Sequence, residues 1–396
     1  MKKLTAFVLL LLFIVLLPAG ALAAGISDSI GEVEAAAAVV MDADTGEVLF
    51  SWHGDAPREP ASIAKMMTAL LVLEAAERGD ISLSDRIVVT ESMLEDVPSD
   101  ASRMRVGIVP GEEFTVEQLL YAHMVSSDCM ASRVLGCFLG GTNDSFCRMM
   151  DRRAEELGCT DTHFTDPSGY PDPAMTTTAR SLAVIARECM THEAFRGIVS
   201  TVRYTLPATN LNGPRELENT NRLLLEEIRD GNGEPVSNPY YSPLAIGIKT
   251  GFSTPAGSCL ASCFDDGERR VIIVVLGTTP YSVTAEDGSA EVVMPQYGET
   301  LRIADAVFHV FSLQKMEEEF SALSARRFEE VDSAEKEYAA VFSAVHDRDP
   351  GLQRLAERSW ALTMSGKERV RYAVLAMAVI LVLSVPSGLI LRRRRR

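Results

Sequence analysis

The stretch PREPASIAKMMTALL, residues 57–71, places a serine at the start of an apolar helix and a lysine one turn later. Ser62 and Lys65 are three residues apart, so on a helix their side chains lie on one face, within reach of each other. A serine hydroxyl is a poor nucleophile until a base removes its proton. Lys65 can be that base if apolar surroundings and a neighbouring cation favour its neutral amine. Alone, the spacing is more typical of a solvated helix cap followed by a snorkelling lysine.

Two further stretches carry polar residues that suit a binding cleft. MVSSDCMAS, residues 124–132, presents hydroxyl and carboxylate side chains at a break between two predicted helices. GIKTGFSTPAGSCLAS, residues 247–262, places Lys-Thr-Gly on a predicted strand. A lysine and a hydroxyl there can hold a carboxylate, and the glycine lets a substrate backbone approach closely.

The remaining pattern predicts an α+β fold in which an antiparallel sheet is covered by helices. Residues 35–53 alternate around a turn at 44–46, which is typical of a β-hairpin. Residues 62–190 hold several amphipathic helical runs, one of which begins with a capping box formed by Thr115 and Gln118. Short strand-like runs follow from residue 245 to 278, and a helix is predicted near residues 300–313.

The two ends of the chain predict a membrane-anchored protein whose body lies outside the cell. Residues 1–24 read as a secretory signal peptide, with a basic start, an apolar stretch and small residues near Ala23. Residues 316–369 are rich in Glu, Arg and Ala and read as a helical stalk. Residues 370–396 read as a transmembrane helix followed by a cytoplasmic polyarginine tail, because 20 residues from Tyr372 to Leu391 carry no charge.

Composition excludes several classes of function. The formal net charge is −17, and seven of the 38 basic residues lie at the two ends, so the body repels nucleic acid. The seven cysteines include no CxxC pair and are interpreted as buried small residues without a disulfide framework. The six histidines show no metal-binding spacing. We therefore expect no metal and no other cofactor.

The ordered trio SxxK, Ser-x-Asp and KTG resembles the signatures of the penicillin-recognising serine enzymes. The likeness is closest to the D-alanyl-D-alanine carboxypeptidases among the low-molecular-mass penicillin-binding proteins. It covers about residues 36–279, in blocks such as MDADTGEVLF, VPGEEFTVEQLL, ELENTNRLL and GIKTGFSTPAG. The resemblance implies a β-lactamase/transpeptidase-like catalytic domain over residues 30–315, which removes the terminal D-alanine from peptidoglycan pentapeptides and binds β-lactam antibiotics covalently.

The resemblance also implies roles for single residues. Ser62 looks like the acylated nucleophile, Lys65 like its general base, and Ser126 like the shuttle that protonates the leaving D-alanine. Lys249 and Thr250, followed by Gly251, would hold the terminal carboxylate of the substrate. The backbone N–H groups of Ser62 and Phe252 would form the oxyanion hole.

Three features depart from the family pattern. Asp128 stands where an asparagine is usual and is predicted to contact substrate. Beside the two lysines its carboxylate would favour their protonated forms and make Lys65 a less effective base, so we expect Asp128→Asn to leave acylation intact or improve it. The arginine that usually precedes the last helix has no clear counterpart, Arg302 being the nearest. Residues 316–366 do not read as the β-rich second domain that is common in these enzymes.

Two alternatives stay open. A serine β-lactamase of class A needs a positioned glutamate, but EELG at residues 155–158 reads as a helix end. A wall-binding protein on the same fold, catalytically weakened by Asp128, would not turn over substrate.

Overall fold

The structure is a computed structural model that describes residues 19–95, 106–229, 233–284, 290–316, 318–319 and 322. The chain divides into a unit of residues 1–312 and a unit of residues 313–396. Most of the predicted stalk and the whole predicted transmembrane segment lie outside the described residues. Within the described ranges, no helix is both long and apolar enough to cross a membrane.

The N-terminal part of the description begins with helix α2 (Ala19–Ile30), which runs across the predicted cleavage point near Ala23. Its C-terminal half packs on the domain, since Ile26 and Ile30 are buried. Residues 1–18 lie outside the described residues. The signal peptide therefore stays a prediction.

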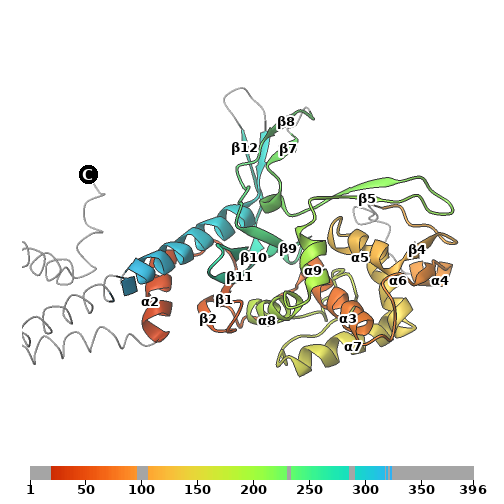
Figure 1. Cartoon of the computed structure of the whole chain (residues 1–396), viewed down its shortest axis with the longest axis horizontal. Helices are drawn as coiled ribbons and strands as arrows, with labels where there is room; N and C mark the ends of the chain where they lie inside the picture. Colours follow the sequence, from red (N-terminus) through yellow and green to blue (C-terminus); the bar gives the residue numbers. More distant parts are fainter. Residues whose placement is uncertain are drawn as a thin grey trace, which may run out of the picture. The chain divides into compact units, whose positions relative to one another are not determined.

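A five-stranded sheet forms the centre of the first unit. Its order is β2 (Val48–Trp52), β1 (Ala37–Asp42), β11 (Arg270–Thr278), β10 (Gly257–Asp265) and β9 (Ala245–Ser253). All four neighbouring pairs are antiparallel. The predicted hairpin and the three late strands thus meet in one sheet, and the α+β prediction is confirmed (Figure 1). Strand β9, which carries the KTG sequence, lies at an edge.

The sheet is buried on both faces, as the alternation along β11 shows. Val271, Ile273 and Val275 belong to the cluster that packs against α2 and the helix over residues 295–316. Ile272 and Val274 belong to the larger cluster on the other face, which includes the helical block. Because successive strand residues point to opposite faces, one run of apolar residues serves both layers.

Helix α3 (Lys65–Glu77) lies at the centre of the helical block and continues the 3₁₀ turn η1 (Ala61–Ala64). Every residue from Lys65 to Leu73 is buried, because neighbouring helices surround α3. Those neighbours are α5 (Val116–Met124), α6 (Cys129–Gly140), α7 (Asn143–Glu156), α8 (Ala179–Cys189) and α9 (Glu193–Ser200). The predicted capping box at Thr115 is confirmed.

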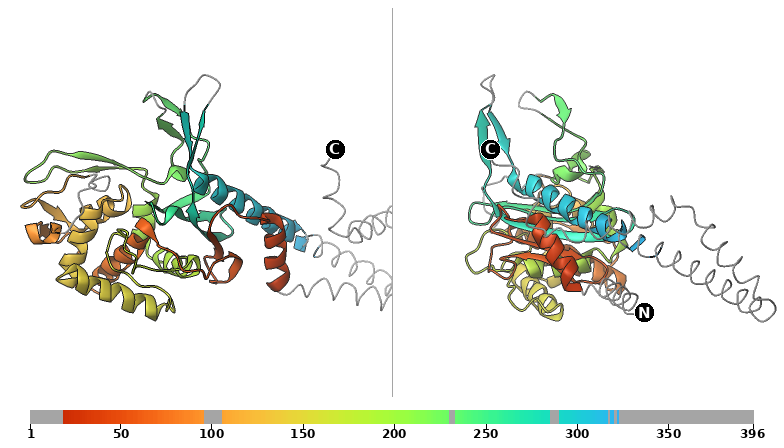
Figure 2. Two further views of the ribbon diagram at one scale, coloured as in Figure 1. Left: turned by 180° about the vertical axis from the view of Figure 1, so that it is seen from behind. Right: turned by 90° about the vertical axis from the view of Figure 1, so that its left-hand side faces the viewer.

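Smaller elements complete this unit, and some of its two-stranded pairs extend from the body (Figure 2). They are the short helix α4 (Glu91–Leu94), the 3₁₀ turn η2 (Arg222–Leu224), whose Leu223 is buried, and four two-stranded antiparallel pairs. The pairs are β3 (Arg86–Val88) with β4 (Glu113–Thr115), β5 (Arg203–Leu206) with β6 (Arg215–Glu218), β7 (Glu227–Arg229) with β8 (Pro235–Ser237), and β12 (Tyr281–Thr284) with β13 (Ala290–Val293).

Candidate active site

Ser62 and Lys65 form the predicted pair. The Lys65 side chain is fully buried, and its Nζ donates to Ser62 Oγ at 3.1 Å. The same Nζ donates to the carbonyl of Ser168 at 2.8 Å and contacts Cys129 Sγ at 3.5 Å. A buried lysine needs such partners, because an ammonium without them is costly to bury. The partners aim Nζ at the serine oxygen, as a general base requires.

The carbonyl of Ser168 belongs to a turn that the sequence analysis did not assign to the site. Asp166 Oδ1 accepts from Ser168 N at 2.7 Å, and its Oδ2 accepts from Arg133 Nε at 3.2 Å. Thr68, one turn after Lys65, donates to the carbonyl of Pro167 at 2.7 Å. The DPSG sequence was a visible signal for this turn, since aspartate often hydrogen-bonds the backbone two residues on.

Two glycines allow other segments to approach the Ser62 turn. A Cβ on Gly169 would lie 1.9 Å from the carbonyl oxygen of Ala61, and one on Gly251 would lie 3.2 Å from that of Pro60. Ala61 itself has a positive φ of 47°. Such backbone strain often occurs at functional sites. The KTG strand therefore packs directly on the turn that carries Ser62.

Lys249 lies in the same buried region as Lys65. It is 1% exposed, and its Nζ donates to the carbonyl of Thr250 at 3.0 Å. His123 reports on both lysines: burial lowers its pKa well below the usual value, and the charges of Lys65 and Lys249 lower it further. The neutral ring donates from Nε2 to the carbonyl of Lys65 at 2.9 Å. Both lysines are therefore close enough to His123 for their charges to act on its ring.

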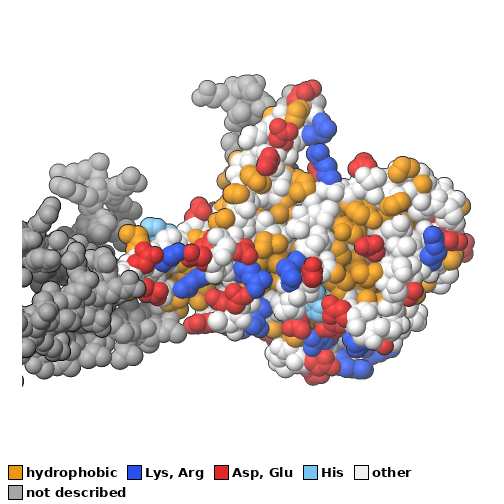
Figure 3. Space-filling view, viewed as in Figure 1, with side chains coloured by type: hydrophobic (Ala, Val, Ile, Leu, Met, Phe, Trp, Pro, Cys, Tyr) orange, Lys and Arg blue, Asp and Glu red, His pale blue; other side chains and the backbone are white. Residues whose placement is uncertain are grey.

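Side chains of strand β9 form the outer edge of the site. Phe252 is 57% exposed. In Figure 3, hydrophobic side chains gather beside β9, over the region that Figure 1 labels α5 and α9. Thr250 is half-buried, and its hydroxyl lies 2.7 Å from that of Thr220. Thr220 lies within the sequence ELENTNRLL, which by itself indicates no role for this residue.

The second motif, Ser-x-Asp at residues 126–128, makes contacts that were not predicted from the sequence. Ser126 is buried and donates to the carbonyl of Ala122 at 2.7 Å, at the end of α5. Ser127 adopts a positive φ of 61°. Among the described residues, it is Cys129 that contacts Lys65 from this motif. Cys129 was interpreted as a core residue, and only its spacing from Ser126 could have hinted otherwise.

Asp128 is part of the scaffold. Its Oδ1 accepts from Ala131 N at 2.9 Å, which caps helix α6, and its Oδ2 accepts from Val106 N at 2.9 Å. Burial raises the pKa of Asp128, whereas these two backbone N–H groups and the Lys65 charge lower it less strongly. Both carboxylate oxygens are therefore committed to the backbone, and the prediction that Asp128 contacts substrate has no support in its orientation.

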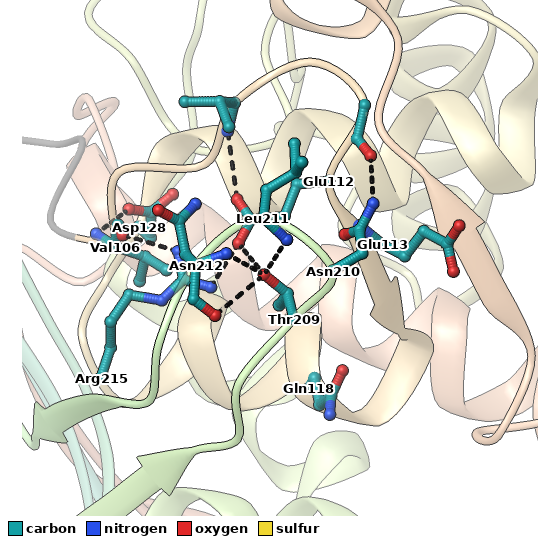
Figure 4. A network of polar contacts seen from close by, with 12 residues as sticks. Val106, Glu112, Glu113, Gln118, Asp128, Thr209, Asn210, Leu211, Asn212 and Arg215 are labelled. Carbon is teal, nitrogen blue, oxygen red and sulfur yellow. Dashed lines mark hydrogen bonds and ion pairs between the residues drawn. The ribbon is translucent and has the colours of Figure 1, made fainter.

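A polar network continues from Asp128 to the β5–β6 pair (Figure 4). Arg215 donates to the carbonyl of Val106 at 3.1 Å and to Glu112 Oε1 at 2.6 Å. Thr209 donates to the same Glu112 oxygen at 2.6 Å. Burial would raise the pKa of Glu112, but the bonds from Arg215 and Thr209 outweigh it and the pKa is lowered. The loop that precedes the second motif is thus fixed by a buried ion pair.

Arg302 does not lie at this site. It sits on the helix over residues 295–316, where it bonds Glu299 Oε2 at 3.1 Å and the carbonyl of Glu32 at 2.9 Å. These partners belong to the layer that covers the other face of the sheet. Its guanidinium is bound in that layer, so Arg302, the nearest candidate in sequence, does not supply the arginine of the family pattern to this site.

Two further groups of side chains are the cysteines and a cluster of possible metal ligands. None of the seven cysteines, all within the described ranges, forms a disulfide, and all except the half-buried Cys137 are buried. Among the residues that the structure describes, one group of potential metal ligands, Glu74, Glu188 and His192, has ligand atoms within 4.8 Å of one another. Arg153 Nη2 contacts both carboxylates, at 2.7 and 2.8 Å. Its guanidinium offsets one of the two negative charges and competes with a metal.

The comparisons with known proteins fit this geometry. The family model described as D-alanyl-D-alanine carboxypeptidase matches residues 24–279. D-alanyl-D-alanine carboxypeptidase DacF of Bacillus subtilis is 30% identical over 254 residues, which cover 64% of this chain and 60% of that protein. The crystal structure of the Streptomyces K15 DD-transpeptidase is 26% identical with a TM-score of 0.58, and the match covers 70% of this chain and 98% of that one. A penicillin-binding protein of Listeria monocytogenes in its ampicillin-bound form is 25% identical with a TM-score of 0.54, covering 70% of this chain and 98% of that one.

Proposed function

Because this chain belongs to the D-alanyl-D-alanine carboxypeptidase family, we propose that it hydrolyses the terminal D-Ala–D-Ala bond of peptidoglycan stem peptides through an acyl-enzyme on Ser62. The observation that carries the proposal is the 3.1 Å bond between Nζ of the fully buried Lys65 and Ser62 Oγ. The packing of Gly251 against the Ser62 turn supports it, because it brings the KTG strand to the nucleophile.

Acylation follows from these positions. Ser62 Oγ attacks the carbonyl carbon of the penultimate D-alanine, and its proton passes to Lys65. The backbone N–H groups of Ser62 and Phe252 stabilise the oxyanion. The C–N bond then breaks, and Ser126 delivers the proton to the departing D-alanine nitrogen. For that step the Ser126 hydroxyl rotates away from the carbonyl of Ala122, which it contacts at 2.7 Å.

Substrate binding relies on the edge strand. Lys249 and Thr250 hold the carboxylate of the terminal D-alanine, and Gly251 leaves room for the peptide backbone. Water then attacks the ester carbonyl, which releases the shortened peptide and returns the proton to Ser62. No cofactor takes part in this scheme.

β-Lactam antibiotics would acylate the same serine, and slow release would make them covalent inhibitors. The proposal favours a carboxypeptidase over a β-lactamase because Glu155 lies exposed near the end of α7 and not in contact with the Ser62 pair. A purely wall-binding role is not favoured, since the Ser62–Lys65 contact is intact.

We also propose that the protein is held at the cell membrane by residues 370–396, with its catalytic domain outside and its C-terminus in the cytoplasm. Support comes from the sequence alone: 20 uncharged residues followed by five arginines. Such an anchor would place the site next to its polymeric substrate.

The activity is tested by incubating the protein with a pentapeptide that ends in D-Ala-D-Ala and measuring free D-alanine. We expect release by the native protein and none by Ser62→Ala. Absence of D-alanine with the folded native protein would reject the hydrolase, and rapid nitrocefin turnover would favour the β-lactamase.

A further inference from the structure

Thr220 contacts the KTG strand, the segment before Ser126 and the helix over residues 295–316. Its hydroxyl lies 2.7 Å from the hydroxyl of Thr250 on the KTG strand. Its backbone N–H donates to the carbonyl of Val125 at 3.1 Å, directly before Ser126. Its carbonyl accepts from the Tyr297 hydroxyl at 2.9 Å, and Tyr297 lies on the helix over residues 295–316.

These contacts hold the Thr220 backbone in place. Tyr297 is 2% exposed, and burial raises the pKa of its phenol, so the hydroxyl stays protonated and donates. On the N-terminal side, the Asn219 amide donates to the carbonyls of Val199 and Thr201 at 3.1 and 2.9 Å. A side chain on such a fixed backbone loses little freedom when it orients a neighbour.

The proton count of the hydroxyl pair decides what Thr220 does. Each threonine hydroxyl has one proton to donate and two lone pairs to accept. A distance of 2.7 Å is that of a full O–H···O hydrogen bond, so one hydroxyl donates to the other. If Thr220 donates, the proton of Thr250 is left for a bound carboxylate, beside the Lys249 ammonium.

We infer that Thr220 is a positioning residue for the carboxylate site: it donates to Thr250 and thereby turns the Thr250 hydroxyl toward the terminal carboxylate of the substrate. The inference rests on the proposed function for the position of that carboxylate. It adds a determinant of specificity for a free C-terminal carboxylate, and a chain of polarised hydrogen bonds strengthens the last donor.

Binding to the full chain with Ser62→Ala separates recognition from catalysis. The probes are Nα-acetyl-D-Ala-D-Ala and its C-terminal amide, and the measured quantity is the Kd of each. Adding Thr220→Val should weaken binding of the acid about tenfold and leave the amide within about twofold, since the Thr250 hydroxyl loses its hydrogen-bond partner and is no longer held toward the charged carboxylate. Thr220→Ser should keep the preference for the acid.

The matched control is Thr162→Val. Thr162 forms another threonine pair, with its hydroxyl 2.9 Å from that of Thr177, and neither residue contacts the site described above. We expect this variant to bind both probes as the parent does. Thermal melting of each variant shows that the fold is retained.

The outcomes distinguish the inference from the function. Equal weakening of acid and amide by Thr220→Val, or no weakening at all, overturns the role of Thr220. Absence of acid preference in the Ser62→Ala parent also overturns it. If the native protein releases no D-alanine but the parent prefers the acid through Thr220, the carboxylate site stands and the hydrolase proposal alone fails.

Discussion

The first and third motifs, SxxK and KTG, differ from the second motif, Ser-x-Asp, in what their polar groups contact. Lys65 Nζ is aimed at Ser62 Oγ, and the KTG strand packs on the same turn. In the second motif, Ser126 bonds the carbonyl of its own helix, and both oxygens of Asp128 accept backbone N–H groups. The difference teaches that a motif residue can keep its position in the chain and still serve the scaffold.

The scaffold role has a physical origin. Asp128 precedes α6, where unpaired N–H groups favour an acceptor side chain. A carboxylate has two acceptor oxygens and therefore also holds Val106, whereas an asparagine would offer one oxygen and an NH₂ group. The buried pair of Arg215 and Glu112 then fixes the loop that contains Val106.

The largest effect is expected at Lys65, in the SxxK motif. Lys65→Met keeps an unbranched side chain, one atom shorter, but removes the base, so the rate of acylation by penicillin should fall by roughly 10²–10⁴-fold. Stopped-flow labelling measures the rate, with circular dichroism as the check on folding. A fall of less than tenfold in a folded variant would show that another group takes the serine proton.

Asp128→Asn tests the structural role of Asp128 in the second motif. The amide NH₂ would face one of the two backbone donors, so we expect a loss of about 1–3 kcal/mol in the free energy of unfolding. The measurement is urea denaturation at pH 7. This expectation replaces the one drawn from sequence, because acylation should fall together with the order of the motif. Unchanged stability with faster acylation would instead restore the sequence-based interpretation.

Acid should lower the free energy of unfolding through His123, which contacts the backbone of Lys65 in the SxxK motif. Above its ordinary pKa of 6.5 the ring is neutral whether the chain is folded or unfolded. Below that pH the unfolded ring binds a proton that the buried ring resists, so stability falls by up to about 1.4 kcal/mol per pH unit toward the lower folded pKa. Denaturation between pH 6.5 and 5 should give a smaller slope for His123→Gln, and equal slopes would contradict this.

The smallest effect is expected at Cys129. A thiol is a weak hydrogen-bond partner, so Cys129→Ala should change the acylation rate by less than about fivefold. Cys137→Ala, a change of the same size on the same helix α6, should have no effect. A loss as large as that of Lys65→Met would make Cys129 a part of the catalytic machinery.

Local pattern predicted most of the fold and the two lysines of the site. The hairpin, the capping box at Thr115 and the strands that carry KTG follow from alternation and turn residues that the chain displays directly. The Ser168 carbonyl and the Thr220 hydroxyl were missed, because their roles depend on contacts between segments far apart in the chain. The backbone contacts of Asp128 were also missed, since a carboxylate looks the same in sequence whether or not it caps a helix.

The central claim is that Ser62 forms a covalent acyl-enzyme with the aid of Lys65. Incubation with a fluorescent penicillin, followed by peptide mass spectrometry, tests it most directly. We predict one adduct per chain on the peptide that contains Ser62, and none in Ser62→Ala. An adduct on another residue, or an equally labelled Ser62→Ala protein, would contradict the account.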